Sequence, residues 1–492
     1  MTEPDIVVVG AGSSGCALVQ RLSLDPSLQI LLLEAGVSGE GDPAVRTPGR
    51  WVSLMGSSYD WGYVTAPEPG LAGRRIAVPR GKAHGGSSAI NAMVHIRGSR
   101  AAYDAWRAPG NPGWGYDDVL PYFERDGLLA VVQGDDPHES HLAFLRAAAE
   151  LGFAANPHHD FNGPEPHGVA GFFPKNIRDG RRHSAAAAFL APAMRRPNVQ
   201  VLSPVRATRL VIEGRRVRGV EYLRDGRREQ VIARREVVLC AGAIDSPRLL
   251  MHSGIGPAAD LRAHGIPVVA DLPGVGQNLQ DHLKLSIRWQ GRTTVRGSSV
   301  VAGLFTSSSR EQGDLQVIVG RGLDQPDDVI TITVSHLKPR SRGTVTLTSA
   351  DPLAPVCIRV NYLSDPHDVD VLVEGVGLAR HFAATRAYDG LRGEEIEPGV
   401  STSDLRRFVR TKADSIYHAS GTCRMGPESD RGAVVGPDLR VHGVEGLRVA
   451  DASIMPVIVD APTHAAAVMI GEKCAAIITG SARADRPVQT QR

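Results

Sequence analysis

Ile6-Val7-Val8-Val9-Gly10-Ala11-Gly12-Ser13-Ser14-Gly15 stands near the start of the chain, and a second apolar run, Ile30 to Leu33, ends on Glu34. An apolar strand, a glycine-rich turn, a helix, a second strand and an acid thus follow one another in the order of a dinucleotide-binding βαβ unit. A lone G-x-G-x-x-G is weak evidence, but the complete ordered set is much stronger. The stretch therefore predicts a Rossmann-like parallel sheet that binds a dinucleotide.

The glycines and the acid of this unit have distinct roles. Gly10 permits the tight turn after the strand, Gly12 lets the backbone approach a pyrophosphate, and Gly15 allows the helix to pack closely on the strand. The pyrophosphate would lie at the helix N-terminus, where unpaired N–H groups and the helix dipole favour negative charge. Glu34 can accept hydrogen bonds from both hydroxyls of an adenosine ribose, and it would repel the 2′-phosphate of an NADP-type ligand.

Length and composition place the chain among large globular proteins without a strong charge bias. Its 492 residues predict two domains, and Lys+Arg 55 against Asp+Glu 53 gives a net charge of +2, which favours neither nucleic acid nor an anionic membrane. Five scattered cysteines form no disulfide or CxxC pattern. The first strand begins by Ile6, which leaves no room for a signal peptide, and no apolar stretch approaches the roughly 18 residues of a membrane span. We expect a cytoplasmic protein with no metal site, no nucleic-acid partner and no membrane partner.

The middle of the chain changes to a β pattern. Short strands are expected between residues 199 and 233, and the apolar run over 236–240 is typical of a buried parallel strand that returns to the nucleotide sheet. Alternating strands recur between 283 and 360, and a helix is expected over 368–384. The predicted fold class is α/β, or α+β overall, with a Rossmann-like parallel sheet and a second domain built on an antiparallel sheet with helical cover.

The predicted dinucleotide-binding domain is discontinuous. It comprises residues 1–155, 185–282 and 415–492, and residues 156–184 and 283–414 form the substrate-binding domain. A second fingerprint is absent, because Gly274-Val275-Gly276 leads into polar residues and not into an apolar helix. With a single dinucleotide site, a redox enzyme must carry its redox chemistry in that ligand or bind NAD itself.

Two histidines near the C-terminus stand in unusual settings. His418 lies in Tyr417-His418-Ala419-Ser420-Gly421-Thr422-Cys423-Arg424-Met425-Gly426, and His464 lies just before a helix expected over 465–478. Between them, a short apolar strand ends on Asp451. A strand end flanked by two histidines is a candidate for the floor of an active site.

Five ordered motifs resemble those of the glucose-methanol-choline (GMC) family of FAD-dependent oxidoreductases, and the resemblance covers nearly the whole chain. The segment from Gly242 to Gly256 matches a family signature at every constrained position. The loop from Gly81 to Asn91 is similar to the other signature. The segment from Gly274 to His282, the His418 segment, and Asp451 to Ser453 also resemble family motifs.

The resemblance implies that the dinucleotide is FAD, that His418 is the active-site base and that His464 is its partner. Asn91 would lie near the reactive edge of the flavin. Some relatives attach FAD covalently through a histidine of the same loop, and because the equivalent residue is Ile90, we expect non-covalent FAD. The expected cofactor contacts are Gly10, Gly12, Ser13, Ser14, Gly15, Glu34, Ala35, Gly85, Gly86, Ser87, Asn91, Ala92, Val94, Val205, Ala241, Gly242, Asp451, Ala452 and His464.

The remaining histidines of these motifs are interpreted as structural. His84 and His95 depart from the family signature, in which an aliphatic and an aromatic residue are usual. Each of them, like His282, can be a satisfied buried or loop histidine. Asp281 is interpreted as a turn-forming residue that can still touch the cofactor.

Alcohol oxidation gives the C-terminal histidines a chemical role. The reaction removes a hydroxyl proton and transfers a hydride from the same carbon to flavin N5. An imidazole with an ordinary pKa near 6.5 can take that proton at neutral pH, and a second histidine can hydrogen-bond the developing alkoxide. The predicted activity is FAD-dependent oxidation of an alcohol to an aldehyde or ketone, with the electrons passed to oxygen or another acceptor.

Other functions stay open at this point. A hydroxynitrile lyase of the same family keeps the flavin and a histidine pair without a net redox step, and an amine oxidase or a dinucleotide sensor would belong to another class. The poorly matched region over 283–411 would line the substrate pocket, so the motifs do not choose the alcohol. The favoured substrate is a primary alcohol that is aromatic, furanic or carries a sugar-like hydroxymethyl group.

Overall fold

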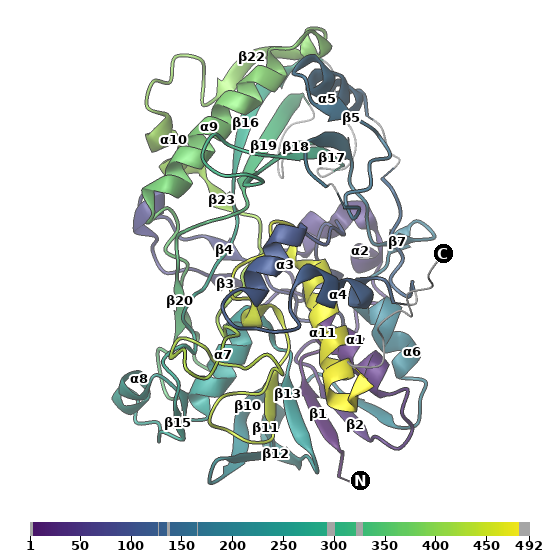
Figure 1. Cartoon of the computed structure of the whole chain (residues 1–492), viewed down its shortest axis with the longest axis vertical. Helices are drawn as coiled ribbons and strands as arrows, with labels where there is room; N and C mark the ends of the chain where they lie inside the picture. Colours follow the sequence, from purple (N-terminus) through teal and green to yellow (C-terminus); the bar gives the residue numbers. More distant parts are fainter. Residues whose placement is uncertain are drawn as a thin grey trace.

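The computed structural model describes residues 3–125, 127–134, 138–164, 166–292, 301–320 and 328–481. A parallel sheet lies toward one end of the long axis, near the N-terminus, and an antiparallel sheet lies toward the other end (Figure 1). Strands of the parallel sheet come from both ends of the chain, because the middle of the chain builds the antiparallel sheet. The predicted fold class is confirmed, whereas the predicted domain boundaries stay a prediction.

Five parallel strands form the first sheet, in the order β24-β13-β1-β2-β9. β1 lies in the centre, and its four residues are buried and pair in parallel with β2 and β13. The apolar run predicted as a returning parallel strand is thus β13, a direct neighbour of β1, as expected for a strand covered on both faces. The bounds are β1 Ile6–Val9, β2 Ile30–Leu33, β9 Val199–Leu202, β13 Glu236–Leu239 and β24 Leu447–Val449.

Two helices from opposite ends of the chain pack together beside this sheet. They are α1, Ser13–Leu22, and α11, Thr463–Thr479. A Cβ atom on Gly15 would lie 2.0 Å from the carbonyl oxygen of Gly10, and one on Gly471 would lie 2.2 Å from that of Ser14. The close approach of α1 to the turn and to α11 therefore requires glycine at both positions.

The sheet is flanked by a smaller antiparallel sheet, in which β11 lies between β10 and β12. The three strands are β10 Arg206–Glu213, β11 Arg216–Arg224 and β12 Arg227–Ile232, and they confirm the short strands expected before residue 233. The helix α7, Gly242–His252, follows β13 and packs on β10.

The large antiparallel sheet has the order β22-β16-β19-β18-β17-β6-β5, and β23 pairs with β16 beside this path. In β16 every second residue from Leu283 is buried, while Lys284, Ser286 and Arg288 are only partly buried. This period of two separates an apolar face from a polar face. The bounds are β5 Ala154–Ala155, β6 Val169–Phe172, β16 Leu283–Gly291, β17 Ala302–Thr306, β18 Leu315–Gly320, β19 Val329–His336, β22 Arg392–Glu397 and β23 Asp414–Ser415.

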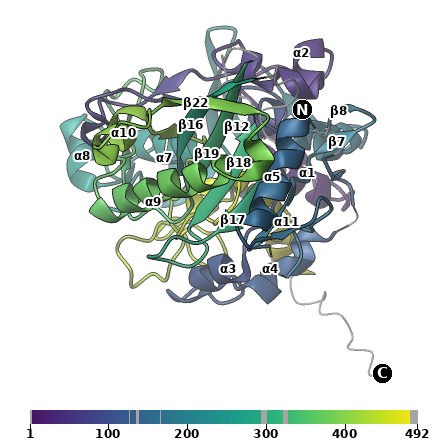
Figure 2. The ribbon, with the colours of Figure 1, turned by 90° about the horizontal axis from the view of Figure 1, so that it is seen from above.

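Helices cover the apolar face of the large sheet. The helix α9, Pro366–Ala383, contacts β16, β18 and β19, and α5, Glu139–Glu150, contacts β17 and β18 (Figure 2). The helical cover predicted over 368–384 is thus α9. The predicted division assigned α5 to the dinucleotide-binding domain, yet the helix packs on the antiparallel sheet, because Ala143, Phe144 and Ala147 join the apolar core of that sheet.

The other helices and strands are shorter. No described helix is long and apolar enough to cross a membrane. The remaining helices are α2 Pro43–Arg46, α3 Arg100–Arg107, α4 Tyr116–Phe123, α6 Ala191–Ala193, α8 Ala258–Ala263 and α10 Leu405–Lys412. The remaining strands are β3 Tyr63–Val64, β4 Ala77–Val78, β7 Ile177–Arg178, β8 Arg181–Arg182, β14 Ile255–Gly256, β15 Ala270–Asp271, β20 Thr344–Thr346 and β21 Cys357–Arg359.

The tight contact of α1 with the turn predicts a large difference between two helical glycines. Gly15→Ala is expected to lower the free energy of unfolding by at least about 1–3 kcal/mol, because its methyl group must displace backbone. Gly377→Ala, in α9, is the matched control, since a Cβ there meets nothing within 4 Å, and it should be neutral or stabilising by up to about 1 kcal/mol. Urea unfolding followed by circular dichroism measures both values. Equal stability of Gly15→Ala and the wild type would contradict the packing described.

Candidate active site

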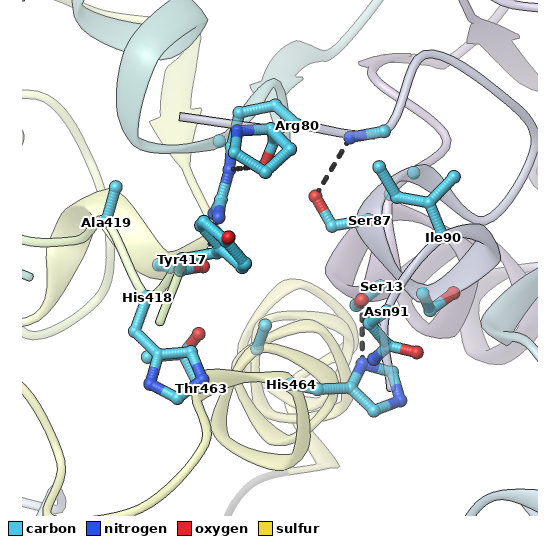
Figure 3. Close-up of a pocket in the computed structure, with 18 of the residues that line it drawn as sticks. Ser13, Arg80, Ser87, Ile90, Asn91, Tyr417, His418, Ala419, Thr463 and His464 are labelled. Atoms are coloured by element: carbon cyan, nitrogen blue, oxygen red, sulfur yellow. Dashed lines mark hydrogen bonds between the residues drawn. The ribbon is translucent and has the colours of Figure 1, made fainter. Parts of the chain in front are cut away.

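A cavity of about 1390 Å³ lies between the parallel sheet and the large antiparallel sheet. His418 and His464, the two candidate catalytic residues, both line it, and they come from the segment after β23 and from the first turn of α11 (Figure 3). Every residue expected to contact the cofactor also lines this cavity, except Gly15 and Gly85. The fold therefore brings together side chains that are more than 400 residues apart in the sequence.

Gly15 and Gly85 lie behind the wall and support it. Gly15 makes the helix contact described above. Gly85 has a φ of +91°, its N–H donates to the Ala11 carbonyl (2.7 Å), and a Cβ on it would lie 3.2 Å from the nitrogen of Ala186. That either glycine contacts the cofactor stays a prediction, and in the structure both glycines allow close packing of neighbouring backbone.

The glycine turn after β1 and the loop before α3 share one stretch of the cavity wall. Gly10 has a φ of +104°, as a tight turn requires, and a Cβ on Gly86 would lie 2.7 Å from the Cα of Gly12. The two backbones therefore touch with no side chain between them. Such a bare backbone surface beside the N-terminus of α1 fits a pyrophosphate.

Glu34 is buried at the end of β2. Its carboxylate accepts hydrogen bonds from the backbone N–H groups of Ala11 (2.8 Å) and Gly36 (2.7 Å). Burial raises the pKa of Glu34 to about 7, although these hydrogen bonds act in the opposite direction. The side chain also lines the cavity, so it is positioned to meet a ribose.

Asp451, like Glu34, is a buried carboxylate that follows a strand of the parallel sheet, in this case β24. Its carboxylate accepts hydrogen bonds from the N–H of Gly242 (2.9 Å), the hydroxyl of Ser246 (2.6 Å) and the N–H of Ser453 (2.8 Å). Burial raises the pKa of Asp451 above its usual value, and the hydrogen bonds lower it. The carboxylate thus ties the end of β24 to the start of α7 at the cavity.

A buried arginine that sequence reasoning missed holds the loop that carries Asn91. One Nη of Arg182 donates to the carbonyl oxygen (2.6 Å) and to the side-chain oxygen (2.9 Å) of Asn91, and also to the Ser88 carbonyl (3.2 Å). These bonds orient the side chain of Asn91, which lines the cavity near Ile90 (Figure 3). Arginine is abundant in this chain, so no local pattern singled out Arg182.

His282 lies directly against His418, which corrects its interpretation as a structural histidine. The Nδ1 atoms of the two rings are 2.9 Å apart, and the rings meet edge to face with centroids 5.2 Å apart. On the far side of His282, Nε2 lies 2.9 Å from the carbonyl oxygen of Leu337. Asp281, interpreted as a turn residue, accepts a hydrogen bond from the backbone N–H of His418 (2.6 Å). Both residues therefore position His418.

These contacts determine where His418 carries its proton. A carbonyl oxygen only accepts, so His282 must donate to Leu337 from Nε2–H. Burial lowers the pKa of His282 to about 3, which keeps the ring neutral and leaves its Nδ1 as an acceptor. His418 must then donate from Nδ1–H. Its own pKa lies well below the usual value, first because of burial, so Nε2 of His418 is an unprotonated acceptor at neutral pH.

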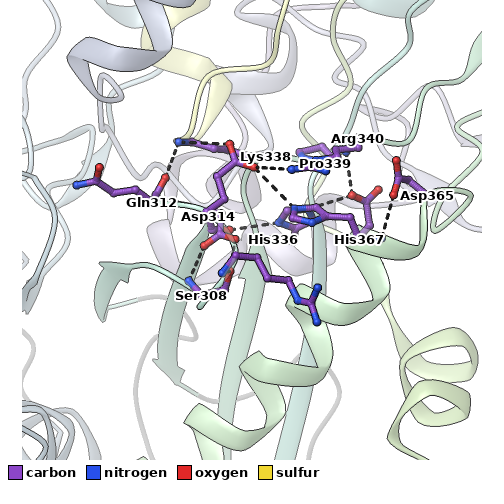
Figure 4. Close-up of polar contacts among 12 residues, drawn as sticks. Ser308, Gln312, Asp314, His336, Lys338, Pro339, Arg340, Asp365 and His367 are labelled. Atoms are coloured by element: carbon purple, nitrogen blue, oxygen red, sulfur yellow. Dashed lines mark hydrogen bonds and ion pairs between the residues drawn. The ribbon is translucent and has the colours of Figure 1, made fainter.

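The carbonyl that begins this chain of hydrogen bonds belongs to a well-anchored segment (Figure 4). The N–H of Leu337 donates to the carbonyl of Asp314 (2.8 Å), which also faces Nδ1 of His336 at 3.3 Å. Nε2 of His336 lies 3.2 Å from the carboxylate of Asp368. Burial opposes ionisation of Asp368, but the hydrogen bond from His336 and others lower its pKa to about 2. The end of β19 is thus held in place behind the two histidines.

His464 occupies a different setting from that of His418. Its Nδ1 lies 2.9 Å from the hydroxyl oxygen of Ser13, in the turn that approaches the pyrophosphate. His95 packs edge to face on its ring, with centroids 6.0 Å apart. Burial, aided by the positive charge of Arg182, lowers the pKa of His464 to about 3. His464 is therefore neutral at physiological pH and can donate or accept one hydrogen bond.

Two histidines interpreted as structural keep that interpretation in the structure. His84 contacts the Ser203 hydroxyl through Nε2 (2.7 Å), and His95 packs behind His464. Neither residue lines the cavity.

Comparison with known proteins identifies the family. Models of the GMC oxidoreductases match residues 4–284 and 339–471. The chain belongs to the GMC oxidoreductase family. It is accordingly a FAD-dependent enzyme that acts on an alcohol. Among curated proteins it is similar to the oxygen-dependent choline dehydrogenase of Sinorhizobium medicae, with 39% identity over 97% of this chain and 96% of that protein.

Solved structures share the whole fold of this chain. The pyridoxine 4-oxidase of Mesorbium loti superposes with a TM-score of 0.91 and 33% identity, over 96% of this chain and 98% of that one. A fungal aryl-alcohol oxidase superposes with a TM-score of 0.86 and 26% identity, over 98% of this chain and 99% of that one. The fold of this chain is therefore common to enzymes named for different alcohols.

The hydrogen-bond chain predicts a specific protonation state for each ring. At pH 7, nitrogen NMR of histidine-labelled protein should show His282 protonated at Nε2 and His418 protonated at Nδ1, both neutral. His282→Gln, with an amide that can donate to Leu337 and accept from His418, should leave the His418 signal in the same tautomer. An imidazolium signal for His418, or a proton on its Nε2, would contradict the geometry.

Proposed function

We propose that the enzyme oxidises a primary alcohol to an aldehyde and that His418 removes the hydroxyl proton through Nε2. The proposal rests on the two hydrogen bonds that connect the Leu337 carbonyl, His282 and His418. They leave Nε2 of His418 as the acceptor. No described residue makes a hydrogen bond to this nitrogen, and His418 lines the cavity. A substrate hydroxyl can therefore reach it at the distances that general-base catalysis requires.

The cavity fits FAD without a covalent link. Its glycine turn, its bare Gly86 backbone and the Glu34 carboxylate match a pyrophosphate and a ribose, and the side chain of Ile90 offers no nucleophile for a bond to the flavin. When bound, FAD would accept the hydride that leaves the carbinol carbon, so the alcohol loses its hydroxyl proton and a hydride, which together amount to two protons and two electrons. The two electrons then pass to oxygen or another acceptor.

His464 is suited to hold the substrate oxygen. Its neutral ring is fixed on one side by Ser13, and it lines the same cavity as His418. A second hydrogen bond to the hydroxyl would orient the carbinol carbon and stabilise the oxygen as negative charge develops on it. Asn91, oriented by Arg182, would lie beside the substrate on the loop from Gly81 to Asn91.

The names of similar enzymes support a hydroxymethyl group on a ring as the substrate. Pyridoxine 4-oxidase and the fungal aryl-alcohol oxidase share the whole fold, and the former is 33% identical. The choline dehydrogenases are more similar in sequence, at 39% identity. The ammonium group of Lys284 on the cavity wall disfavours a cationic alcohol such as choline.

Anaerobic flavin bleaching tests the proposed reaction. The purified protein should be yellow, and benzyl alcohol should bleach its absorbance. His418→Ala should slow bleaching by at least about 100-fold, the usual contribution of a general base. His264→Ala is the control, because His264 is only partly buried and does not line the cavity.

Other outcomes would exclude the proposal. A protein that carries no flavin, or flavin that no alcohol bleaches while a cyanohydrin is cleaved, would contradict alcohol oxidation. Unchanged bleaching in His418→Ala would exclude His418 as the base.

A further inference from the structure

The polar face of the large antiparallel sheet forms the cavity wall opposite the glycine turn. Three residues of β16 and three of the neighbouring strands face the cavity from it: Lys284, Ser286, Arg288, Gln316, Ile318 and Thr333. Only one of the six is apolar. The wall residues after Lys284 lie between the two segments that match the family models, and Lys284 is the last residue of the first segment.

Among the described cations of this wall, Lys284 differs from Arg288 and Lys412 in that it forms no ion pair. Arg288 and Lys412 share the carboxylate of Glu397, at 2.6 Å and 2.7 Å. Within the described residues, Lys284 forms no ion pair. Asp414, its cross-strand partner on β23, also lines the cavity and raises the pKa of Lys284 without coming within ion-pairing distance. Burial lowers the pKa of Lys284, as expected for an ammonium group that lacks a close counter-ion.

Lys284 lies close to the proposed site of chemistry. It follows His282 by two residues, so along the extended chain their Cα atoms are about 7 Å apart. Its Nζ stands 5.3 Å from the ring centroid of Tyr417, the residue before His418.

The same contact disfavours a cationic substrate. A quaternary ammonium group binds on the faces of aromatic rings. The ring of Tyr417 already carries the ammonium group of Lys284, and the nearby carboxylate of Glu397 is shared by two cations. A trimethylammonium group on this face of the cavity would therefore meet like charge, and the other aromatic rings that line the cavity belong to Trp51, Trp61 and Phe173.

We infer that the alcohol oxidised by this enzyme carries an anionic group, a carboxylate or a phosphate, that binds Lys284 across the ring from the hydroxymethyl group. This substrate class rests on the proposed alcohol oxidation. The anion would form an ion pair with Lys284, and it would orient the hydroxymethyl group toward His418 and His464.

Binding of ligands without a hydroxyl group tests the inference separately from the reaction. The FAD-loaded enzyme is titrated with 4-methylbenzoate, 4-methylbenzamide, 4-methylphenyl phosphate and 4-methylphenyltrimethylammonium, with the flavin spectrum as readout. The better of the two anions should bind at least tenfold more tightly than the amide and the ammonium compound. The anion with the higher affinity identifies the carboxylate or the phosphate as the preferred group.

Three variants assign the preference to one side chain. Lys284→Met should reduce the ratio of anion to amide affinity to less than threefold, whereas Lys284→Arg should keep it. Lys338→Met is the matched control, since it removes one lysine charge at the end of β19 outside the cavity wall, and it should leave the ratio unchanged.

Two results would overturn the inference. They are equal binding of anion, amide and ammonium compound by the wild type, and an unchanged ratio in Lys284→Met. Neither result depends on turnover, so alcohol oxidation by His418 is judged separately by the bleaching experiment.

Discussion

A chain of two hydrogen bonds, from the Leu337 carbonyl through His282 to His418, fixes the one unprotonated nitrogen on which the proposed chemistry depends. Its three residues follow β19, precede β16 and follow β23. Pairing of β16 with β19 and with β23 therefore brings all three together. The antiparallel sheet thus supplies the wall of the cavity and also holds the catalytic base in one tautomer.

Burial has opposite effects on the acids and the histidines of this site, and both effects suit the proposed function. It lowers the pKa of His282 and His464 to about 3, so both rings stay neutral hydrogen-bonding groups through the physiological range. It raises the pKa of Glu34 and Asp451, whose carboxylates are held by backbone N–H groups and, for Asp451, by the Ser246 hydroxyl. The cavity therefore presents neutral imidazoles and, nearby, the Lys284 ammonium group, which forms no ion pair with any described residue.

Local sequence patterns predicted much of the fold, because the elements concerned follow from short-range rules. The apolar run of β1, the glycines of the turn and the apolar β13 indicated a parallel sheet, and the alternation in β16 indicated an antiparallel one. The ends of the predicted helices shifted by one or two residues, since α9 begins at Pro366 and α11 at Thr463.

Contacts between distant segments could not be predicted in the same way. His282 was interpreted as structural, because its contact with His418 arises only when β16 pairs with β23. Arg182 was missed for a related reason, since the loop it holds lies about 90 residues earlier in the chain. Gly85 was assigned to the cofactor on its motif alone, and its packing against Ala186 was not visible in the sequence.

The limiting rate of anaerobic flavin reduction, measured from pH 5 to pH 9 in the wild type and in two variants of His282, tests the central claim most directly. The wild-type rate should be constant above about pH 6, because His418 is already neutral there. His282→Gln should stay within about tenfold of the wild type, while His282→Phe, which cannot accept from His418, should be slower than His282→Gln by at least about tenfold. A wild-type rate that rises tenfold per pH unit across the range, or equal rates in His282→Phe and the wild type, would contradict a base held in one tautomer by His282.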